Sequence, residues 1–196
     1  MIGNTILHYF KVLAKVEQPF TQTTTAELKA LKKYCRNALI AVEIGVFEGS
    51  STAQIALSIS ENGILFGIDN FQKGSLGICY SKWITSIVLK RNGVSHKVKL
   101  IEKLSSDATA DVPDELDFIF IDGDHSWDGI DKDWNNWSAK VKKGGIIALH
   151  DTAVPAFDPS REGLDSVRYF VAVIQHDSSY ELKETIDSLR ILEKIA

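Results

Sequence analysis

Short apolar runs alternate with amphipathic stretches along the chain from residue 39 onward. The runs read LIAVEIG (39–45), ILFGID (64–69), KVKLIE (97–102), LDFIFID (116–122) and GIIALHD (145–151). Runs of this length that are rich in β-branched and apolar residues predict buried strands. Helical patterns occupy residues 50–60, 79–93 and 127–145. Strand and helix in alternation predict an α/β fold with a doubly wound, mostly parallel sheet.

Helical spacing also marks the amino-terminal part of the chain. Apolar residues recur at this spacing within residues 1–14, which predicts a first helix. A threonine cluster then offers an N-cap near Thr24 for a second helix, in which Leu28, Leu31 and Tyr34 mark one face. We therefore expect two helices before the first strand.

The carboxy-terminal part predicts a helix followed by a hairpin. The helical pattern covers residues 166–176, and two strand-like runs follow at 180–186 and 189–195. Only two residues separate these runs, which favours an antiparallel hairpin. We expect amino-terminal helices over residues 1–38 and an α/β domain over residues 39–196, together forming one structural domain.

Composition and charge narrow the possible partners. The chain has 196 residues, of which 44% are hydrophobic and 24% charged, with a net charge of -4. This composition is typical of a globular protein. No block of Lys and Arg exceeds two residues, which argues against nucleic acid and anionic membrane surfaces. We expect a cytoplasmic protein that binds a small molecule, and the sequence leaves a homo-oligomer possible.

Acidic residues stand where several predicted strands end. In an open α/β sheet, ligands bind beyond the carboxyl ends of the strands. Glu43 and Gly45 close the first strand, Asp69 the second, Asp122 the fourth and Asp151 the fifth. Because the strands are predicted to be parallel, these residues are expected at one edge of the sheet.

The turn after the first strand predicts a cofactor site. Gly45 and Gly49 would let backbone amides approach a ligand closely, and a carboxylate such as Asp69 at the end of the second strand commonly holds a ribose. Phe47 and Glu48 would obstruct a pyrophosphate, so a dinucleotide is disfavoured.

Acidic residues near this turn favour a cofactor that carries positive charge. Glu43 and Glu48 would suit the sulfonium and α-amino groups of S-adenosylmethionine. The alternative is that the two glycines only permit a tight turn, and that Ser50 and Ser51 only begin the following helix.

Three segments carry a resemblance to a known family. EIGVFEGSS (43–51), GIDNF (67–71) and DFIFIDGDHSWDGIDKDWNNWSAKVKKGGIIALHDT (117–152) resemble class I S-adenosylmethionine-dependent methyltransferases. The branch that they resemble is related to macrocin and mycinamicin sugar O-methyltransferases and to cephalosporin-hydroxylase-like proteins. The resemblance implies a Rossmann-like fold and methylation of a hydroxyl group on a sugar or another natural-product-like small molecule.

The resemblance also implies which residues bind the cofactor. Glu43, Gly45, Phe47 and Ser51 would surround its methionine part, and Asp69, with Asn70 as its neighbour, would accept from the ribose hydroxyls. Ser105, Ser106 and Asp107 would enclose its adenine. The adenine turn lacks the Gly-Asp-Ser that the family often has. The complete set expected to bind the cofactor is Glu43, Gly45, Phe47, Gly49, Ser50, Ser51, Asp69, Asn70, Ser105, Ser106 and Asp122.

The strand ends further predict a metal ion. Asp122 and Asp151 would converge on Mg²⁺, which needs only one or two carboxylates from a protein. In similar metal-dependent O-methyltransferases the neighbour of the second aspartate also binds the metal, and this neighbour is Thr152 here. Thr152 departs from the usual Asn or Asp, so His150 and Asp124 are alternative third ligands.

His125 is the expected general base. In the sugar methyltransferases that this sequence resembles, the His of the DGxH segment removes the proton of the acceptor hydroxyl. An imidazole with a pKa near ~6.5 can accept that proton at neutral pH, and Mg²⁺ would assist by acidifying the hydroxyl. The alternative is that His125 caps the following helix or bonds Asp128.

Other functions remain open at this point. The protein could bind the cofactor without turnover, or it could be an NAD-linked oxidoreductase. The Asp122-Gly123-Asp124 segment also resembles the nucleophile motif of haloacid-dehalogenase-like phosphatases. The loop over residues 152–166 has the composition of a flap, and Arg161 and Arg168 would suit an acidic substrate.

Overall fold

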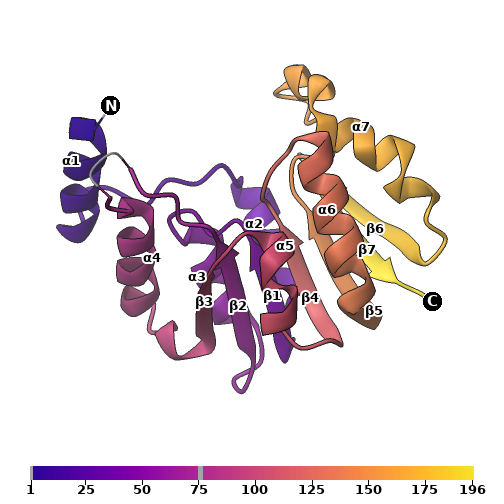
Figure 1. Cartoon of the computed structure of the whole chain (residues 1–196), viewed down its shortest axis with the longest axis horizontal. Helices are drawn as coiled ribbons and strands as arrows, with labels where there is room; N and C mark the ends of the chain where they lie inside the picture. The colour runs from indigo at the N-terminus through magenta and orange to yellow at the C-terminus, as the bar shows by residue number, and fades with distance from the viewer. Residues whose placement is uncertain (1, 75–76) are drawn as a thin grey trace.

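The computed structural model describes residues 2–74 and 77–196, and within them the chain forms one seven-stranded sheet (Figure 1). The order across the sheet is β3-β2-β1-β4-β5-β7-β6. Strands β1 to β5 run parallel, and β7 pairs antiparallel with both β5 and β6. The strands are β1 Ile40–Ile44, β2 Ile64–Asp69, β3 Val98–Glu102, β4 Leu116–Ile121, β5 Val141–Leu149, β6 Tyr180–Ile186 and β7 Leu189–Lys194.

Helices cover both faces of this sheet. The α-helices are α1 Ile2–Leu13, α2 Thr25–Tyr34, α3 Ser50–Ser58, α4 Tyr80–Arg91, α5 Ser105–Ala108, α6 Trp127–Trp137 and α7 Asp165–Ala172. Short 3-10 helices lie at Ser95–Lys97, Thr109–Asp111, Ser138–Lys140, Pro159–Gly163 and Ile174–His176. Figure 1 shows α5 and α6 in front of the sheet and α2 and α3 behind it. The expected doubly wound sheet with a carboxy-terminal hairpin is confirmed.

Successive side chains of the strands point to opposite faces of the sheet and pack into two apolar layers, one on each face. In β1, Ala41 belongs to the layer beneath α2, α3 and α4, whereas Val42 and Ile44 belong to the layer beneath α5, α6 and α7. Trp134 and Trp137 of α6 lie in the second layer and are almost completely buried. The two layers fix both faces of the strands, so the strand ends are held at one edge of the sheet.

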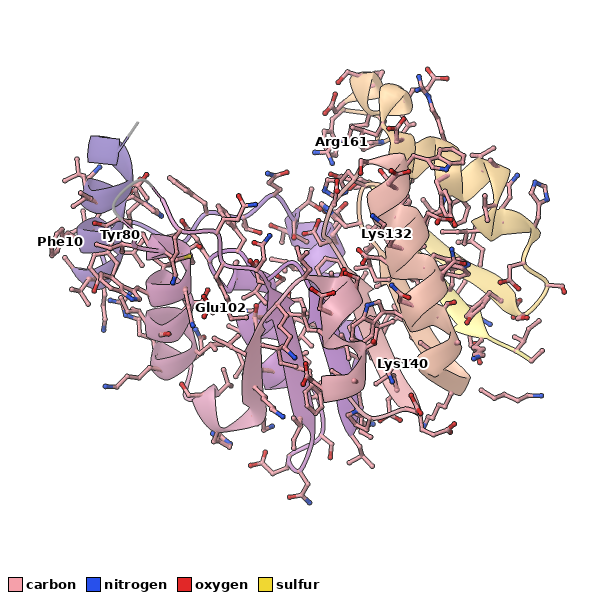
Figure 2. All side chains as sticks on the ribbon, in the orientation of Figure 1. Phe10, Tyr80, Glu102, Lys132, Lys140 and Arg161 are labelled. Carbon is pink, nitrogen blue, oxygen red and sulfur yellow. The ribbon has the colours of Figure 1, made fainter. Side chains whose placement is uncertain are left out.

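The amino-terminal helices join this arrangement on one side. α1 packs against α4, and Figure 2 shows Phe10 and Tyr80 on these two helices at the same end of the sheet. α2 contributes Ala30, Leu31 and Cys35 to the first apolar layer. None of the helices in the described residues has the length and apolar content needed to cross a bilayer.

One boundary differs from the sequence prediction. The helix expected over residues 127–145 ends at Trp137, and β5 begins at Val141. Val141 is buried and pairs with Leu116 of β4, after which the register shifts. Gly144 has a φ of +78°, a conformation that suits glycine. Gly144 and Gly145, the last two residues of the predicted helical range, therefore lie within a strand, where Gly144 permits an irregularity.

The expected N-cap of α2 is confirmed, and it gives a test of the fold. Thr24 Oγ1 accepts from Glu27 N at 3.1 Å, and Thr24 N donates to Glu27 Oε2 at 2.8 Å, which is a capping box. Thr24 Oγ1 also donates to Asp187 at 2.7 Å. We expect Thr24→Ala to lower the free energy of unfolding by about 1–2 kcal/mol in urea titrations. Thr25→Ala, at the exposed neighbouring position, should change it by less than about 0.5 kcal/mol.

Candidate active site

A cavity of about 630 Å³ opens at the carboxyl ends of β1, β2 and β4. Residues 20–23, which connect α1 to α2, line one side of it. Most of the residues expected to bind the cofactor lie in its wall: Gly45, Phe47, Ser50, Ser51, Asp69, Asn70, Ser105, Ser106 and Asp122. His125 lines the same cavity. Glu43, Gly49 and Asp107 do not reach its wall, and neither do Asp151 and Thr152.

The turn after β1 is shaped by a glycine and by Asp69. Gly45 has a φ of +88°, and a Cβ there would lie 2.0 Å from the carbonyl oxygen of Asp122. Asp69 Oδ2 accepts from Val46 N at 3.0 Å and from Phe47 N at 2.9 Å. Only glycine therefore allows this turn to pack against the end of β4.

Asp69 still has acceptor capacity for a ribose. Its Oδ1 accepts from Phe71 N at 2.7 Å, in addition to the two bonds to Oδ2. A carboxylate offers about four lone-pair directions, so one remains. The expected contact with the ribose fits this geometry and stays a prediction.

Glu43 lies behind the cavity wall. Ser51 Oγ donates to Glu43 Oε1 at 2.5 Å, and Oε2 is buried without a hydrogen-bond partner. Burial raises the pKa of the Glu43 carboxyl to about 8 despite the bond from Ser51, and the charges of Asp122 and Asp69 raise it further. Glu43 therefore orients Ser51, which faces the cavity, and its own carboxyl is uncharged at neutral pH.

Glu48 does not face the cofactor cavity. Its Oε2 accepts from Phe20 N at 2.6 Å and lies 2.9 Å from Nε2 of the buried His8. The sequence suggested that Glu48 would suit a positively charged cofactor. Instead it fastens the segment after α1 to the turn after β1.

Asp133 is a cavity residue that the sequence did not indicate. Ser105 Oγ donates to Asp133 Oδ1 at 2.5 Å. Asp133 is only 3% exposed, and burial raises its pKa to about 6. Asp133 lies on the apolar face of α6 with Ile130 and Trp137. An acidic residue on an otherwise apolar helix face is the sequence signal that could have identified it.

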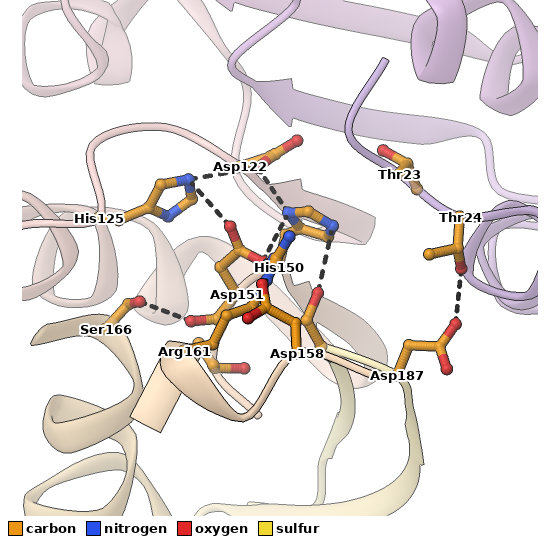
Figure 3. A network of polar contacts seen from close by, with 12 residues as sticks. Thr23, Thr24, Asp122, His125, His150, Asp151, Asp158, Arg161, Ser166 and Asp187 are labelled. Carbon is orange, nitrogen blue, oxygen red and sulfur yellow. Dashed lines mark hydrogen bonds and ion pairs between the residues drawn. The ribbon is translucent and has the colours of Figure 1, made fainter. Parts of the chain in front are cut away.

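Two histidines and two aspartates meet at the ends of β4 and β5, as Figure 3 shows. His125 Nε2 lies 3.7 Å from Asp122 Oδ1 and 3.6 Å from Asp151 Oδ2. Burial lowers the pKa of His125, opposed by the charge of Asp122, so its imidazole is neutral at neutral pH. Ser126, not His125, caps the next helix, because Ser126 Oγ accepts from Gly129 N at 3.1 Å.

His150 is buried between two carboxylates. Its Nδ1 lies 2.9 Å from Asp122 Oδ1, and its Nε2 lies 3.3 Å from Glu27 Oε2. Burial alone would lower the pKa of His150, but the contacts with Asp122 and Glu27 raise it to about 9. His150 therefore carries a positive charge at neutral pH.

The backbone conformation of Asp151 and an ion pair with an arginine fix this residue at the end of β5. Its φ of +52° lies in the left-handed region, which Asp tolerates better than most residues. Ser166 Oγ donates to its carbonyl at 2.5 Å. Its carboxylate Oδ1 pairs with the guanidinium of Arg161, which also contacts Asp158 at 3.1 Å. Arg161 thus has carboxylate partners within the protein.

Thr152 and Asp124, the other residues considered as metal ligands, make hydrogen bonds to the backbone. Thr152 is fully buried, and its Oγ1 donates to the carbonyl of Leu149 at 3.0 Å. Asp124 Oδ1 accepts from Ser126 N at 2.9 Å at the start of α6. Within residues 2–74 and 77–196, no three His, Cys, Asp or Glu side chains are grouped to hold a metal ion.

The donors at the strand ends therefore do not fit the expected Mg²⁺ site. Asp122 already pairs with His150, and Asp151 with Arg161. A divalent ion prefers several oxygen ligands in octahedral geometry, and here the two carboxylate oxygens face basic side chains instead.

Comparisons with known proteins place this geometry in a family. The family described as "Methyltransferase domain" matches residues 42–152. "Probable caffeoyl-CoA O-methyltransferase 3" of Dictyostelium discoideum is 28% identical over 177 residues, which cover 82% of this chain and 61% of that protein. "Tapetum-specific methyltransferase 1" of Arabidopsis thaliana is 34% identical over 128 residues, covering 59% of this chain and 48% of that protein. The matches thus span about half to three fifths of these relatives.

Solved structures share the fold. The O-methyltransferase TomG from Streptomyces achromogenes, in complex with S-adenosylmethionine, superposes with a TM-score of 0.67 at 16% identity over 98% of this chain and 90% of TomG. An O-methyltransferase from Bacillus cereus superposes with a TM-score of 0.67 at 18% identity over 97% of this chain and 91% of that one. The family match favours neither the phosphatase nor the NAD-linked alternative. With a family match over more than half of its residues and the fold of the class I S-adenosylmethionine-dependent enzymes, this chain belongs to the methyltransferase domain family.

Proposed function

We propose that the protein transfers the methyl group of S-adenosylmethionine to a hydroxyl group of a small molecule, with His125 as the general base. The observation that carries this proposal is that His125 and the turn after β1 line the same cavity. A hydroxyl bound between them would lie beside both the cofactor and the base.

The side chains suit such a transfer. Bound S-adenosylmethionine supplies an electrophilic methyl group on a sulfonium. The neutral imidazole of His125 would take the hydroxyl proton as the methyl–sulfur bond breaks and the oxygen–methyl bond forms. Asp122 and Asp151, 3.7 and 3.6 Å from Nε2, stabilise the imidazolium that this transfer creates. The His125 side chain is 33% exposed, so the proton can pass on to water.

The cofactor site is supported by the residues around the turn. Gly45 gives the backbone close access, and Ser51 faces the cavity with its hydroxyl held by Glu43. Asp69 has one acceptor direction left for a ribose hydroxyl. Ser105 and Asp133 line the same cavity, and their hydroxyl and carboxyl groups would serve as polar partners for adenine.

The names of relatives guide the choice of acceptor. The Dictyostelium relative is named for caffeoyl-CoA, and TomG is described as involved in tomaymycin synthesis. Small-molecule hydroxyls are therefore the first acceptors to test. The narrower resemblance to the macrocin and mycinamicin sugar O-methyltransferases stays a prediction, and we include sugar hydroxyls for that reason.

A binding assay and a turnover assay test the proposal together. Isothermal titration should show binding of S-adenosylmethionine and S-adenosylhomocysteine, and NAD⁺ should not compete. S-adenosylhomocysteine release should then be measured with caffeoyl-CoA, catechol and nucleotide sugars, and the methylated oxygen identified by mass spectrometry. Cofactor binding with no turnover on any hydroxyl of this panel would favour a binding protein instead, and methylation at nitrogen or carbon would also contradict the proposal.

A further inference from the structure

We propose that Arg161 takes the place of a divalent ion at this site, holding Asp151 beside His125 so that methyl transfer needs no metal. This inference rests on the proposed function for its role in turnover. Its prediction about metal binding is independent of that function. Arg161 is a positioning residue, since it acts through Asp151.

Arg161 is held against the end of β5 by two carboxylates. Arg161 lies in the 3-10 helix Pro159–Gly163, within the segment between β5 and α7, and Figure 2 shows it on the side of the molecule where the parallel strands end. Its guanidinium contacts Asp151 Oδ1 and Asp158 Oδ2. The Arg161 side chain is 21% exposed and that of Asp151 only 6%. This pair is therefore well shielded from water, unlike most surface ion pairs.

Asp122 and Asp151 each face a basic side chain. Nδ1 of His150 lies 2.9 Å from Asp122 Oδ1, and the guanidinium of Arg161 contacts Asp151 Oδ1. A divalent cation bound by both aspartates would have to displace the guanidinium from one of them and the imidazole from the other.

The carboxylate of Asp151 lies between Arg161 and His125, so its position affects the base. The two oxygens of its carboxylate are divided, with Oδ1 toward Arg161 and Oδ2 3.6 Å from His125 Nε2. Ser166 joins the loops on either side, since its Oγ donates to the carbonyl of Asp151 and its N–H to the carbonyl of His125 at 3.2 Å. The guanidinium and Ser166 together therefore fix Asp151 with its carboxylate beside His125.

Metal binding gives the first test. Mn²⁺ alone, titrated into the purified protein and followed by electron paramagnetic resonance, should remain free at millimolar concentrations. Exhaustive treatment with EDTA should leave turnover unchanged, and added Mg²⁺ should not raise it. Binding of Mn²⁺ in the micromolar range, or loss of turnover with EDTA that Mg²⁺ restores, would overturn the proposal. If no acceptor of the panel is methylated, the proposed function fails while the Mn²⁺ titration still decides about the metal.

Variants of the arginine give the second test. We expect Arg161→Ala to lower kcat by about 10²-fold through misplacement of Asp151, with little change in the affinity for S-adenosylmethionine. Arg161→Lys keeps the charge but loses the planar fork, so it should recover part of kcat. Arg36→Ala is the matched control, because Arg36 is exposed just after α2 and does not line the cavity. A kcat of Arg161→Ala equal to that of Arg36→Ala would contradict the positioning role, and Arg161→Lys provides the comparison if the alanine variant does not fold.

Discussion

Replacing His125 with alanine should lower kcat by about 10²–10⁴-fold, the usual contribution of a general base. The side chain is partly exposed, and its nearest charged partners in the described part of the chain, Asp122 and Asp151, lie 3.7 and 3.6 Å from Nε2, so its removal should leave the fold intact. The cofactor turn around Gly45 and Asp69 does not depend on it. The loss is therefore expected in kcat and not in the affinity for S-adenosylmethionine.

The measurement separates these two quantities. Initial rates of S-adenosylhomocysteine release give kcat, and isothermal titration gives the dissociation constant for S-adenosylmethionine. His96→Ala serves as control, since His96 is exposed in the 3-10 helix Ser95–Lys97 and should not alter either quantity. A variant of His125 that loses cofactor affinity as much as turnover would show that this residue supports binding instead of proton transfer.

The sequence is sufficient to predict the sheet and most of its ligand-binding edge. Strands β1 and β4 consist of short apolar runs, and parallel strands end together, so Asp69, Asp122 and His125 can be placed near one another from the sequence alone. The start of β5 cannot be predicted in the same way. Lys142 and Lys143 interrupt its apolar pattern, and Val141 fits the spacing of the preceding helix as well as it fits a strand.

The charge partners at the site could not be predicted, because they depend on side chains distant in the sequence. Asp151 was expected to bind a metal, but its partner is Arg161, which lies on a segment without periodicity. His150 was considered only as a third metal ligand. Its ring instead contacts both Asp122 and Glu27, and Glu27 is 123 residues away from His150 along the chain. Composition and spacing indicate where charged residues are needed, and tertiary packing decides which of them pair.

Glu27 makes contacts that its local sequence pattern does not predict. The sequence predicts a helix start at Thr24, and the capping box explains a glutamate three residues later. The structure gives that glutamate two further roles. Its Oε1 accepts from Ser188 N at 2.9 Å and from Ser188 Oγ at 2.7 Å in the turn of the hairpin, and its Oε2 lies 3.3 Å from His150. One fully buried carboxylate thus connects α2, β5 and the hairpin.

We therefore expect Glu27→Gln to lower the free energy of unfolding by about 3–5 kcal/mol at neutral pH, the usual cost of leaving one partner of a buried ion pair uncompensated. The substitution keeps an oxygen for Ser188 but removes the charge facing His150. Urea titrations at pH 7 give the value. Glu181→Gln is the control, since Glu181 pairs with Lys183 at 3.1 Å with a side chain that is 57% exposed, and such a pair contributes at most about 1 kcal/mol.

The pH dependence of that difference identifies the ion pair as its cause. Burial alone would raise the pKa of Glu27, but its contacts with His150 and Thr24 lower it from 4.5 to about 2. A carboxyl whose pKa is lower in the folded state stabilises the protein above pH 4.5, and this contribution, about 3 kcal/mol for such a shift, is lost as the pH falls toward 2. The pKa of His150 is raised from 6.5 to about 9, so the same interaction weakens as the pH rises through that interval. The difference in the free energy of unfolding between wild type and Glu27→Gln should accordingly be largest between pH 4.5 and 6.5 and become smaller at lower and higher pH. A difference that stays constant with pH would mean that Glu27 acts through packing and not through its charge.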